Sequence, residues 1–263
     1  MQEITDEQWA AFDQHGFLKL GAVLDPDDLG ALQQRIDDIM LGRAEVDYDR
    51  LMMQLDSTSG QTSDAGPQTL GFKEATLAYR KIQNLELDPL FADYMSRPVF
   101  RDICRRVYGD IPISAFRAMF MNKPARRGTY LPWHQDRWSA LDRDPLITVW
   151  TALDPATVDN GCVQVIDGSH QHGVINPDHP SGWLTELQAH EYCPPEKVVL
   201  LELEPGEAVL LHNWLLHASE INNTDVARRA FSVCYMDGRT VDVPSGNQFP
   251  RVFDADDTAV TVG

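Results

Sequence analysis

Three residues of the chain could together bind a metal ion: two histidines and one aspartate. His134 and Asp136 stand two positions apart, and His217 follows about eighty residues later. On an extended segment, alternate side chains project to the same face, so His134 and Asp136 would point together. Two imidazoles and one carboxylate are the ligand set of non-haem Fe(II) oxygenases, and this set leaves coordination positions open. The spacing therefore permits an iron site if His217 lies on a neighbouring strand.

Taken alone, the short His-x-Asp motif is weak evidence for a metal site. The chain has eight histidines and many acidic residues, so chance supplies about one such motif, and a hydrogen-bonded surface loop would account for it. His212, five residues before His217, is an alternative third ligand. No cysteine stands in the cluster, which disfavours a structural zinc site. A catalytic zinc ion with three protein ligands and an open position remains compatible with the same residues.

The composition excludes several classes of partner. The chain of 263 residues has 22 Lys+Arg against 40 Asp+Glu, a formal net charge of −18. Nucleic acids and anionic membrane surfaces attract clustered cations, so neither is an expected partner. The four cysteines have no disulfide or zinc spacing, and no apolar run reaches the ~18 residues of a membrane span. The polar N-terminus shows no secretory signal, so we expect a cytoplasmic protein.

The elements that must position these residues follow two patterns along the chain. Helical spacing predicts two helices in the first forty residues, with Thr5 and Asp25 at their N-termini, and helical spacing returns at 99–107. The alternation at 16–20, between the first two helices, predicts a short strand. From residue 113 onward, short strands alternate with turn signals, and Asn160-Gly161 favours a tight hairpin. The expected strands are 113–121, 146–153, 162–166, 197–203, 208–212 and 229–236.

We expect a single domain over 1–263 that is mainly β with flanking helices. The helical N-terminal part would cover about 1–110, and the β core would cover about 111–240. Short strands at this spacing indicate a sandwich or barrel rather than βαβ units. Residues 42–68 show little periodicity, which is compatible both with a functional lid and with simple surface disorder.

In combination, the motifs resemble those of the phytanoyl-CoA dioxygenase family. The resemblance is ordered and covers roughly residues 5–237. It implies a double-stranded β-helix, or jelly-roll (cupin-like), core that binds Fe(II) and 2-oxoglutarate. The matching segments are Asn122-Lys123-Pro124, Leu131-Pro132-Trp133-His134-Gln135-Asp136, Trp150-Thr151-Ala152-Leu153-Asp154, Asp159-Asn160-Gly161-Cys162, Asp167-Gly168-Ser169-His170, His217-Ala218-Ser219, Asn222 and Arg228-Arg229-Ala230.

The resemblance also implies roles for individual residues. His134, Asp136 and His217 would be the iron ligands, and His217 is favoured over His212 because Arg228 follows it by eleven residues, as in the family. Arg228 would hold the distal carboxylate of 2-oxoglutarate as a bidentate, charge-assisted pair. The residues implied at or beside this cosubstrate are Arg228, Ser219, Lys81, Met119 and Trp150.

The implied reaction consumes O2 and 2-oxoglutarate, releases succinate and CO2, and hydroxylates or oxidatively cyclises a small molecule. Halogenating relatives have a small residue where this chain has Asp136, so we predict C–H oxidation rather than halogenation. Trp138 and Trp183 are candidate substrate contacts, because aromatic faces pack against sugar rings and other flat apolar surfaces. Arg137, near the ligand loop, is a third candidate, because a guanidinium could recognise an anionic substrate. No basic patch suits the phosphates of coenzyme A. A glycosylated natural product from antibiotic biosynthesis, as in the orthosomycin oxygenases, is compatible with these residues.

Two alternatives come from other functional classes. One is a non-enzymatic jelly-roll module that binds a different divalent ion. The other is a zinc-dependent hydrolase or isomerase on the same scaffold, with the same three ligands. Neither alternative accounts for Ser219 and Arg228 at their spacing after His217. Nothing in the pattern indicates an oligomeric state.

Overall fold

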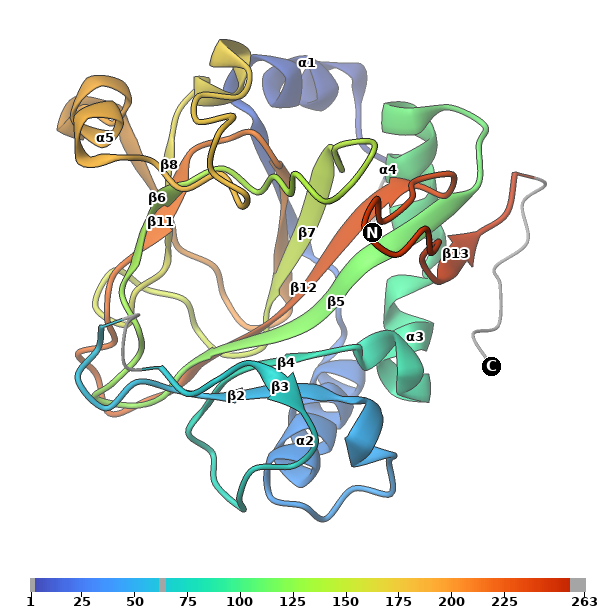
Figure 1. Ribbon diagram of the computed structural model, residues 1–263, viewed down its shortest axis with the longest axis vertical. Coiled ribbons are helices and arrows are strands. Elements are labelled where there is room, and N and C mark those ends of the chain that lie inside the picture. Colours follow the sequence, from blue (N-terminus) through green and yellow to red (C-terminus); the bar gives the residue numbers. More distant parts are fainter. Residues whose placement is uncertain (1–2, 62–64, 256–263) are drawn as a thin grey trace.

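Two antiparallel β-sheets face each other and enclose the centre of the molecule (Figure 1). The structure is a computed structural model that describes residues 3–61 and 65–255. The major sheet has the strand order β1-β10-β7-β12-β5-β4-β2-β3, with β13 also paired to β5, and the minor sheet has the order β6-β11-β8-β9. This arrangement confirms the double-stranded β-helix that the resemblance implies.

Within each sheet, most neighbouring strands are far apart in the sequence. The major sheet consists of β1 (Phe17–Ala22), β2 (Met52–Leu55), β3 (Thr69–Leu70), β4 (Tyr79–Gln83), β5 (Ile113–Lys123), β7 (Ile147–Ala152), β10 (Glu207–His212), β12 (Arg228–Asp237) and β13 (Arg251–Phe253). The minor sheet consists of β6 (Leu131–His134), β8 (Val163–Ile166), β9 (Val198–Leu201) and β11 (His217–Ser219).

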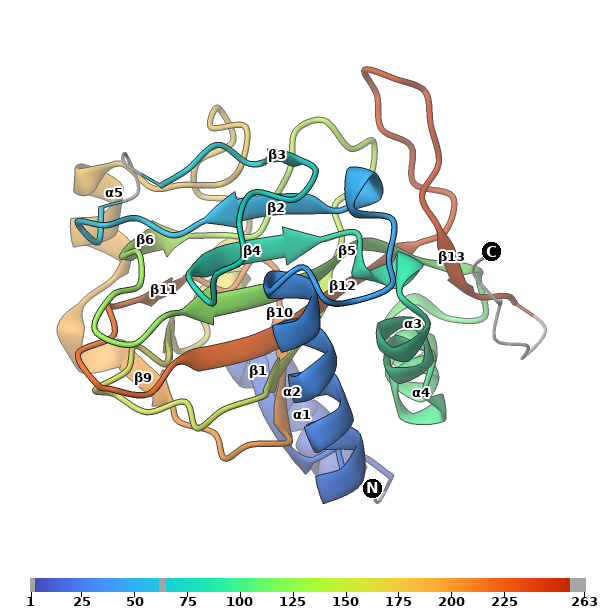
Figure 2. The same cartoon turned by 90° about the horizontal axis from the view of Figure 1, so that it is seen from below.

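Helices from the first 110 residues cover the outer face of the major sheet, whereas the later helix at 186–192 lies beside the minor sheet (Figure 1 and Figure 2). The expected caps are present, because the Thr5 side chain accepts a hydrogen bond from Gln8 N at 3.2 Å and Asp25 accepts one from Asp28 N at 2.9 Å. No helix in the described part of the chain combines the length and the apolar character that crossing a bilayer requires. The helices are α1 (Asp6–His15), α2 (Pro26–Met40), α3 (Pro89–Met95), α4 (Pro98–Tyr108) and α5 (Glu186–Tyr192), and the 3-10 turns are η1 (Tyr48–Arg50), η3 (Leu85–Leu87), η4 (Ser169–His172) and η5 (Pro195–Lys197).

Alternate side chains along the central strands of the major sheet face an apolar core on one side and a polar cavity on the other. On β12, Phe231 and Val233 are fully buried in the apolar core that α2, α3 and α4 complete. The intervening Ser232 and Cys234 face the other way and line a cavity between the sheets. The helices therefore hold the sheet from outside, while its inner face is available for a binding site.

The six strands expected after residue 112 are all present, but three other expectations were wrong or incomplete. The region 1–110 confirms the short strand expected at 16–20, which is β1, but it also contributes the unexpected strands β2 to β4 to the major sheet. Within residues 42–68, Met52–Leu55 form the strand β2 and Gln68 lines the cavity between the sheets, so simple surface disorder is wrong for these residues, while residues 62–64 lie outside the described residues. Asn160-Gly161 forms a turn but not a hairpin, because β7 and β8 belong to different sheets.

Arg229 ties β12 to α2 on the outer face. Its Nε and Nη2 donate to the two carboxylate oxygens of Asp154 at 2.7 and 2.8 Å, and its Nη1 donates to Asp37 at 2.5 Å. The Arg229 side chain is only 17% exposed, so loss of a partner would leave a poorly solvated charge.

We therefore expect Asp154→Ala to lower the free energy of unfolding by about 3 kcal/mol, measured by urea denaturation. Asp225→Ala is the matched control, because Asp225 pairs with Arg126 on the exposed surface, and such pairs contribute little. It should leave the unfolding midpoint nearly unchanged. Similar losses in both variants would show that Arg229 has no special structural role.

Candidate active site

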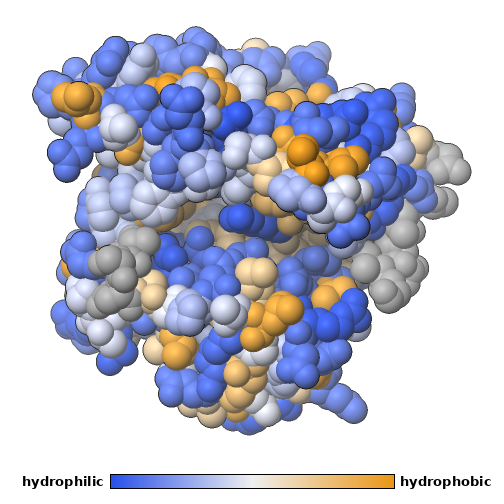
Figure 3. Space-filling model, viewed as in Figure 1, coloured by the Kyte–Doolittle hydropathy of each residue, from blue (hydrophilic) through white to orange (hydrophobic). Residues whose placement is uncertain are grey.

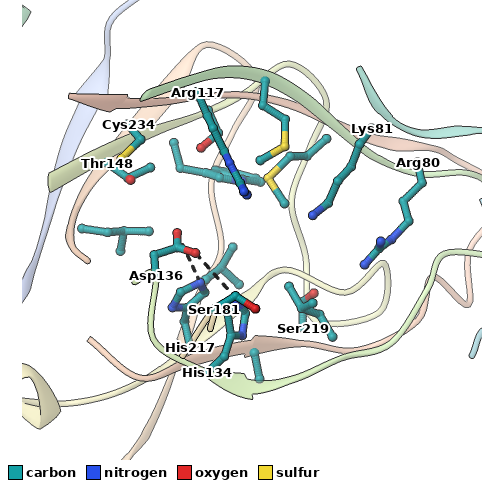
Figure 4. Close-up of a pocket in the computed structure, with 18 of the residues that line it drawn as sticks. Arg80, Lys81, Arg117, His134, Asp136, Thr148, Ser181, His217, Ser219 and Cys234 are labelled. Carbon is teal, nitrogen blue, oxygen red and sulfur yellow. Dashed lines mark ion pairs between the residues drawn. The ribbon is translucent and has the colours of Figure 1, made fainter. Parts of the chain in front are cut away.

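His134, Asp136 and His217 converge on one point at the wall of the cavity (Figure 4). β6 and β11 pair with His134 directly opposite His217, and Asp136 follows the end of β6. One ligand atom from each of the three residues lies within 4.8 Å of the others. The Nε2 atoms of His134 and His217 lie 3.9 and 3.8 Å from the carboxylate oxygens of Asp136.

Backbone carbonyls fix the orientation of both imidazoles. His134 Nδ1 lies 2.8 Å from Pro132 O, and His217 Nδ1 lies 3.0 Å from Leu215 O. Because a carbonyl only accepts, each Nδ1 must donate, and each Nε2 is the ring nitrogen that faces Asp136. Burial and the neighbouring His217 lower the pKa of His134 to about 3, so this ring is neutral at pH 7. Two imidazole nitrogens and one carboxylate oxygen fit a ferrous ion.

His212 does not belong to this cluster. Its ring centroid lies 5.0 Å from that of His170, and its Nδ1 accepts a hydrogen bond from Trp214 N at 3.1 Å. Burial, followed by the proximity of His170, lowers the pKa of His212 to about 4. The structure therefore brings His217, and not His212, to the pair formed by His134 and Asp136.

A cavity of about 280 Å³ lies between the sheets beside this cluster. The face seen in Figure 3 is hollowed near its middle, and hydrophilic side chains surround the hollow. Cations outnumber anions in the lining, although the chain as a whole is acidic. The charged lining residues other than the histidines are Arg80, Lys81, Arg117, Arg228 and Asp136.

Arg228 brings an unused hydrogen-bond donor to the cavity. It is 2% exposed, and its Nη2 donates to Gly161 O at 3.0 Å. Among the described residues, neither Arg228 Nε nor the nearby Trp150 Nε1 has a hydrogen-bond partner. Burial lowers the pKa of Arg228 to about 10, so the guanidinium is charged at pH 7. A buried, charged guanidinium with a free N–H donor fits a carboxylate ligand.

The turn at Gly161 holds Arg228 in place. Gly161 has a φ of +78°, and a Cβ there would lie 2.3 Å from Glu220 O. Only glycine therefore permits the close approach of this loop to the end of β11. The turn signal in the sequence marks a loop whose carbonyl orients the Arg228 side chain, rather than a hairpin.

The other residues implied at the cosubstrate also line the cavity. The sheet register places Met119 and Trp150 on either side of Ser232, and Lys81 pairs with Met121 on the next strand. Ser219 lines the cavity from the minor sheet. Desolvation, with smaller contributions from Arg80 and Arg117, lowers the pKa of Lys81 to about 7. The Lys81 side chain makes no hydrogen bond or ion pair with any other residue that the structure describes.

Of the three residues expected to contact substrate, two line the cavity and one lies outside it. Trp138 and Trp183 line the cavity, but Arg137 does not. The chain turns after Asp136, so the Arg137 guanidinium lies outside, where Nη1 donates to Pro177 O at 2.9 Å and Nε lies 3.8 Å from Asp144.

Sequence reasoning missed Arg117, whose guanidinium does enter the cavity (Figure 4). A signal for it was present. Arg117 stands two residues before Met119, and alternate residues of one strand share a face. Arg80, Thr148 and Ser232 also line the cavity and had not been expected there.

Known proteins resemble this chain along most of its length. The profile of the family described as "Phytanoyl-CoA dioxygenase (PhyH)" matches residues 12–230. A probable phytanoyl-CoA dioxygenase of Caenorhabditis elegans is 26% identical over 246 residues, which cover 88% of this chain and 75% of that protein. Phytanoyl-CoA dioxygenase domain-containing protein 1 of Danio rerio is 26% identical over 268 residues, which cover 90% and 91%.

Solved structures share the fold at lower identity. EctD from S. alaskensis, with 2-oxoglutarate and 5-hydroxyectoine, superposes with a TM-score of 0.67 at 22% identity and covers 89% of this chain and 77% of its own. The carbocyclase SnoK from nogalamycin biosynthesis has a TM-score of 0.64 at 19% identity, with coverage of 92% and 87%. Since the family profile matches most of the sequence, the chain belongs to the phytanoyl-CoA dioxygenase family and is a 2-oxoglutarate-dependent non-haem iron dioxygenase.

Proposed function

We propose that the protein oxidises a small organic molecule at an iron site formed by His134, Asp136 and His217. The observation that carries this proposal is the convergence of these three ligand atoms on a cavity that also contains the buried, incompletely paired Arg228. When bound, Fe(II) and 2-oxoglutarate supply the oxidising power, with consumption of O2 and release of succinate and CO2. The protein itself supplies binding, orientation and exclusion of water.

Five residues that line the cavity would bind the 2-oxoglutarate or pack beside it. Arg228, Ser219 and Lys81 hold the distal carboxylate of 2-oxoglutarate, because all three present hydrogen-bond donors to the cavity. Met119 and Trp150 form the apolar wall beside it, and both are at least nine-tenths buried. Exclusion of water by this wall strengthens the pairing between the carboxylate and the cations.

Lys81 should make cosubstrate binding depend on pH. Its pKa is about 7 because desolvation disfavours the charged form. A bound carboxylate favours that form and raises the pKa, so above pH 7 binding takes up a proton. Affinity should be constant below pH 7 and fall above it, by up to about tenfold per pH unit, until the pKa of the complex is reached.

Isothermal titration of 2-oxoglutarate in the presence of Fe(II), without O2, measures this profile between pH 6 and 9. Lys81→Met should bind more weakly and lose the slope. If the variant keeps the wild-type slope, another group carries the proton.

The proposed substrate is a specialised metabolite, and the proposed outcome is hydroxylation or oxidative ring closure. Trp138 and Trp183 support a substrate with a flat or ring-shaped surface, because both line the cavity beside the metal cluster. Asp136 supports C–H oxidation over halogenation, because the resemblance implies that halogenating relatives have a small residue at this position. SnoK and other natural-product enzymes share this fold, which is compatible with the proposal.

A substrate screen tests the proposed function. The enzyme would be incubated with Fe(II), 2-oxoglutarate, O2 and a panel of ring-containing metabolites, with succinate and product masses measured together. We expect succinate formation to rise with a metabolite that gains one oxygen atom or loses two hydrogen atoms. Hydrolysed or isomerised products without succinate would instead support the zinc-dependent alternative.

A further inference from the structure

Arg117 brings another guanidinium to the cavity, at a strand position far from that of Arg228 along the same sheet. On the inner face of β5, Arg117 is opposite Cys234 of β12, whereas Lys123 is opposite Arg228. The two positions on β5 are six residues apart, or roughly 20 Å at the rise of an antiparallel strand. Figure 4 shows that the Arg117 side chain points toward Asp136 from the wall across from the two histidines. Arg117 therefore stands on the other side of the metal cluster from the proposed cosubstrate end.

Aromatic rings hold Arg117 without using its hydrogen-bond donors. Its guanidinium carbon lies 4.9 Å from the Phe116 ring centroid and 4.7 Å from that of Trp138. These two rings pack against each other at 4.5 Å, and Trp138 is 8% exposed. Ring faces attract a cation but accept none of its N–H bonds in the way an oxygen does. Among the described residues, the Arg117 side chain has no hydrogen bond and no ion pair, so its fork remains available.

In the loaded site, the arginines of the lining outnumber its one carboxylate, which is itself a proposed metal ligand. The two charges of Fe(II) offset the two of 2-oxoglutarate, while Arg80, Arg117 and Arg228 outnumber the one carboxylate, Asp136. The distal carboxylate of the cosubstrate is held at the Arg228 end, so it does not reach Arg117. An unpaired charge in a poorly solvated cavity is costly, and a ligand of opposite charge removes that cost.

From this arrangement we propose that Arg117 anchors the substrate and that the substrate carries a carboxylate. The inference rests on the proposed function and specifies its substrate class. The planar guanidinium pairs with a carboxylate through two parallel hydrogen bonds, and this pairing fixes both the position and the orientation of the substrate. Trp138 acts as a positioning residue, because its ring keeps the Arg117 fork turned into the cavity.

NMR spectroscopy of the arginine Nε–H groups tests this proposal without a known substrate. The protein would be loaded with Zn(II), as a diamagnetic replacement for iron, and with 2-oxoglutarate. Acetate is then the probe, and acetamide is its neutral match in shape. The Arg117 signal is assigned as the one absent in Arg117→Met, and Arg137, which lies outside the cavity, is the matched control.

We expect acetate to shift the Arg117 signal to saturation, with an affinity roughly tenfold or more above that of acetamide. The Arg137 signal should not move, and Arg117→Met should keep its affinity for 2-oxoglutarate within about threefold. Equal effects of acetate and acetamide, or no saturable shift, would overturn the proposal. Competition between acetate and 2-oxoglutarate would overturn it as well, because Arg117 would then belong to the cosubstrate site.

The experiment separates this inference from the proposed function. If 2-oxoglutarate does not bind the metal-loaded wild type, the proposed function fails at the first step. If 2-oxoglutarate binds but acetate does not act at Arg117, the oxygenase proposal stands and only the substrate class is wrong.

Discussion

His217→Ala is expected to lower Fe(II) affinity by more than about 100-fold and to abolish turnover. The substitution removes one of three converging ligand atoms, and even outer-shell partners of such ligands change metal affinity by about 10- to 100-fold. Anaerobic titration with Fe(II) measures the affinity, and thermal unfolding checks that the variant is folded. His217 begins a three-residue strand, so truncation of its side chain leaves the backbone pairing with β6 and β8 intact.

His212→Ala is the matched control for this variant. His212 stands five residues earlier and packs against His170 outside the cluster. It should keep the wild-type affinity for Fe(II). Loss of iron in His212→Ala together with its retention in His217→Ala would reverse the assignment of the third ligand.

Arg228→Met is expected to weaken 2-oxoglutarate binding by about 100-fold or more while Fe(II) binding persists. Removal of one partner from a buried, hydrogen-bonded charge pair costs about 2–5 kcal/mol, and each 1.4 kcal/mol is a factor of about ten in affinity. Arg228→Lys should recover part of the loss, because an ammonium keeps the charge but not the two parallel donors. Isothermal titration with 2-oxoglutarate measures the affinity of the wild type, Arg228→Met and Arg228→Lys.

Arg229→Met supplies the control for Arg228, because the two residues are adjacent but face opposite sides of β12. Arg229 pairs with Asp154 and Asp37 on the outer face. Its loss should reduce stability but leave 2-oxoglutarate affinity unchanged, measured well below the unfolding temperature. If Arg228→Met bound 2-oxoglutarate as the wild type does, the distal carboxylate would have to lie elsewhere.

The metal cluster could be predicted from the sequence, but the strands that build it could not. His134 and His217 stand in sequence motifs that resemble those of the family, and the fold brings the two side chains together as expected. β6 and β11, however, span only four and three residues, and their pairing has an irregular register between His217 and Ser219. Segments so short carry too few alternations to mark a strand, and pairing between residues this distant leaves no local pattern.

On the substrate side of the cavity, the sequence alone predicted the lining residues poorly. Arg137 directly follows Asp136 in the sequence, yet the chain turns there and the Arg137 side chain leaves the site. Arg117 lies seventeen positions before His134, and only the inner face of β5 brings it into the cavity. Net charge was equally uninformative, because a chain of charge −18 encloses a cavity with a cationic lining. Which face of a strand is inside depends on tertiary packing, and composition does not encode it.

Anaerobic titration of the protein with Fe(II) and then 2-oxoglutarate tests the central claim most directly. A weak visible charge-transfer band reports 2-oxoglutarate bound to the iron. We predict this band in the wild type, its absence in His217→Ala, and its appearance in Arg228→Met only at much higher 2-oxoglutarate concentrations. Absence of the band in wild-type protein that has bound Fe(II) would contradict the account and favour a metal-binding module or a hydrolase.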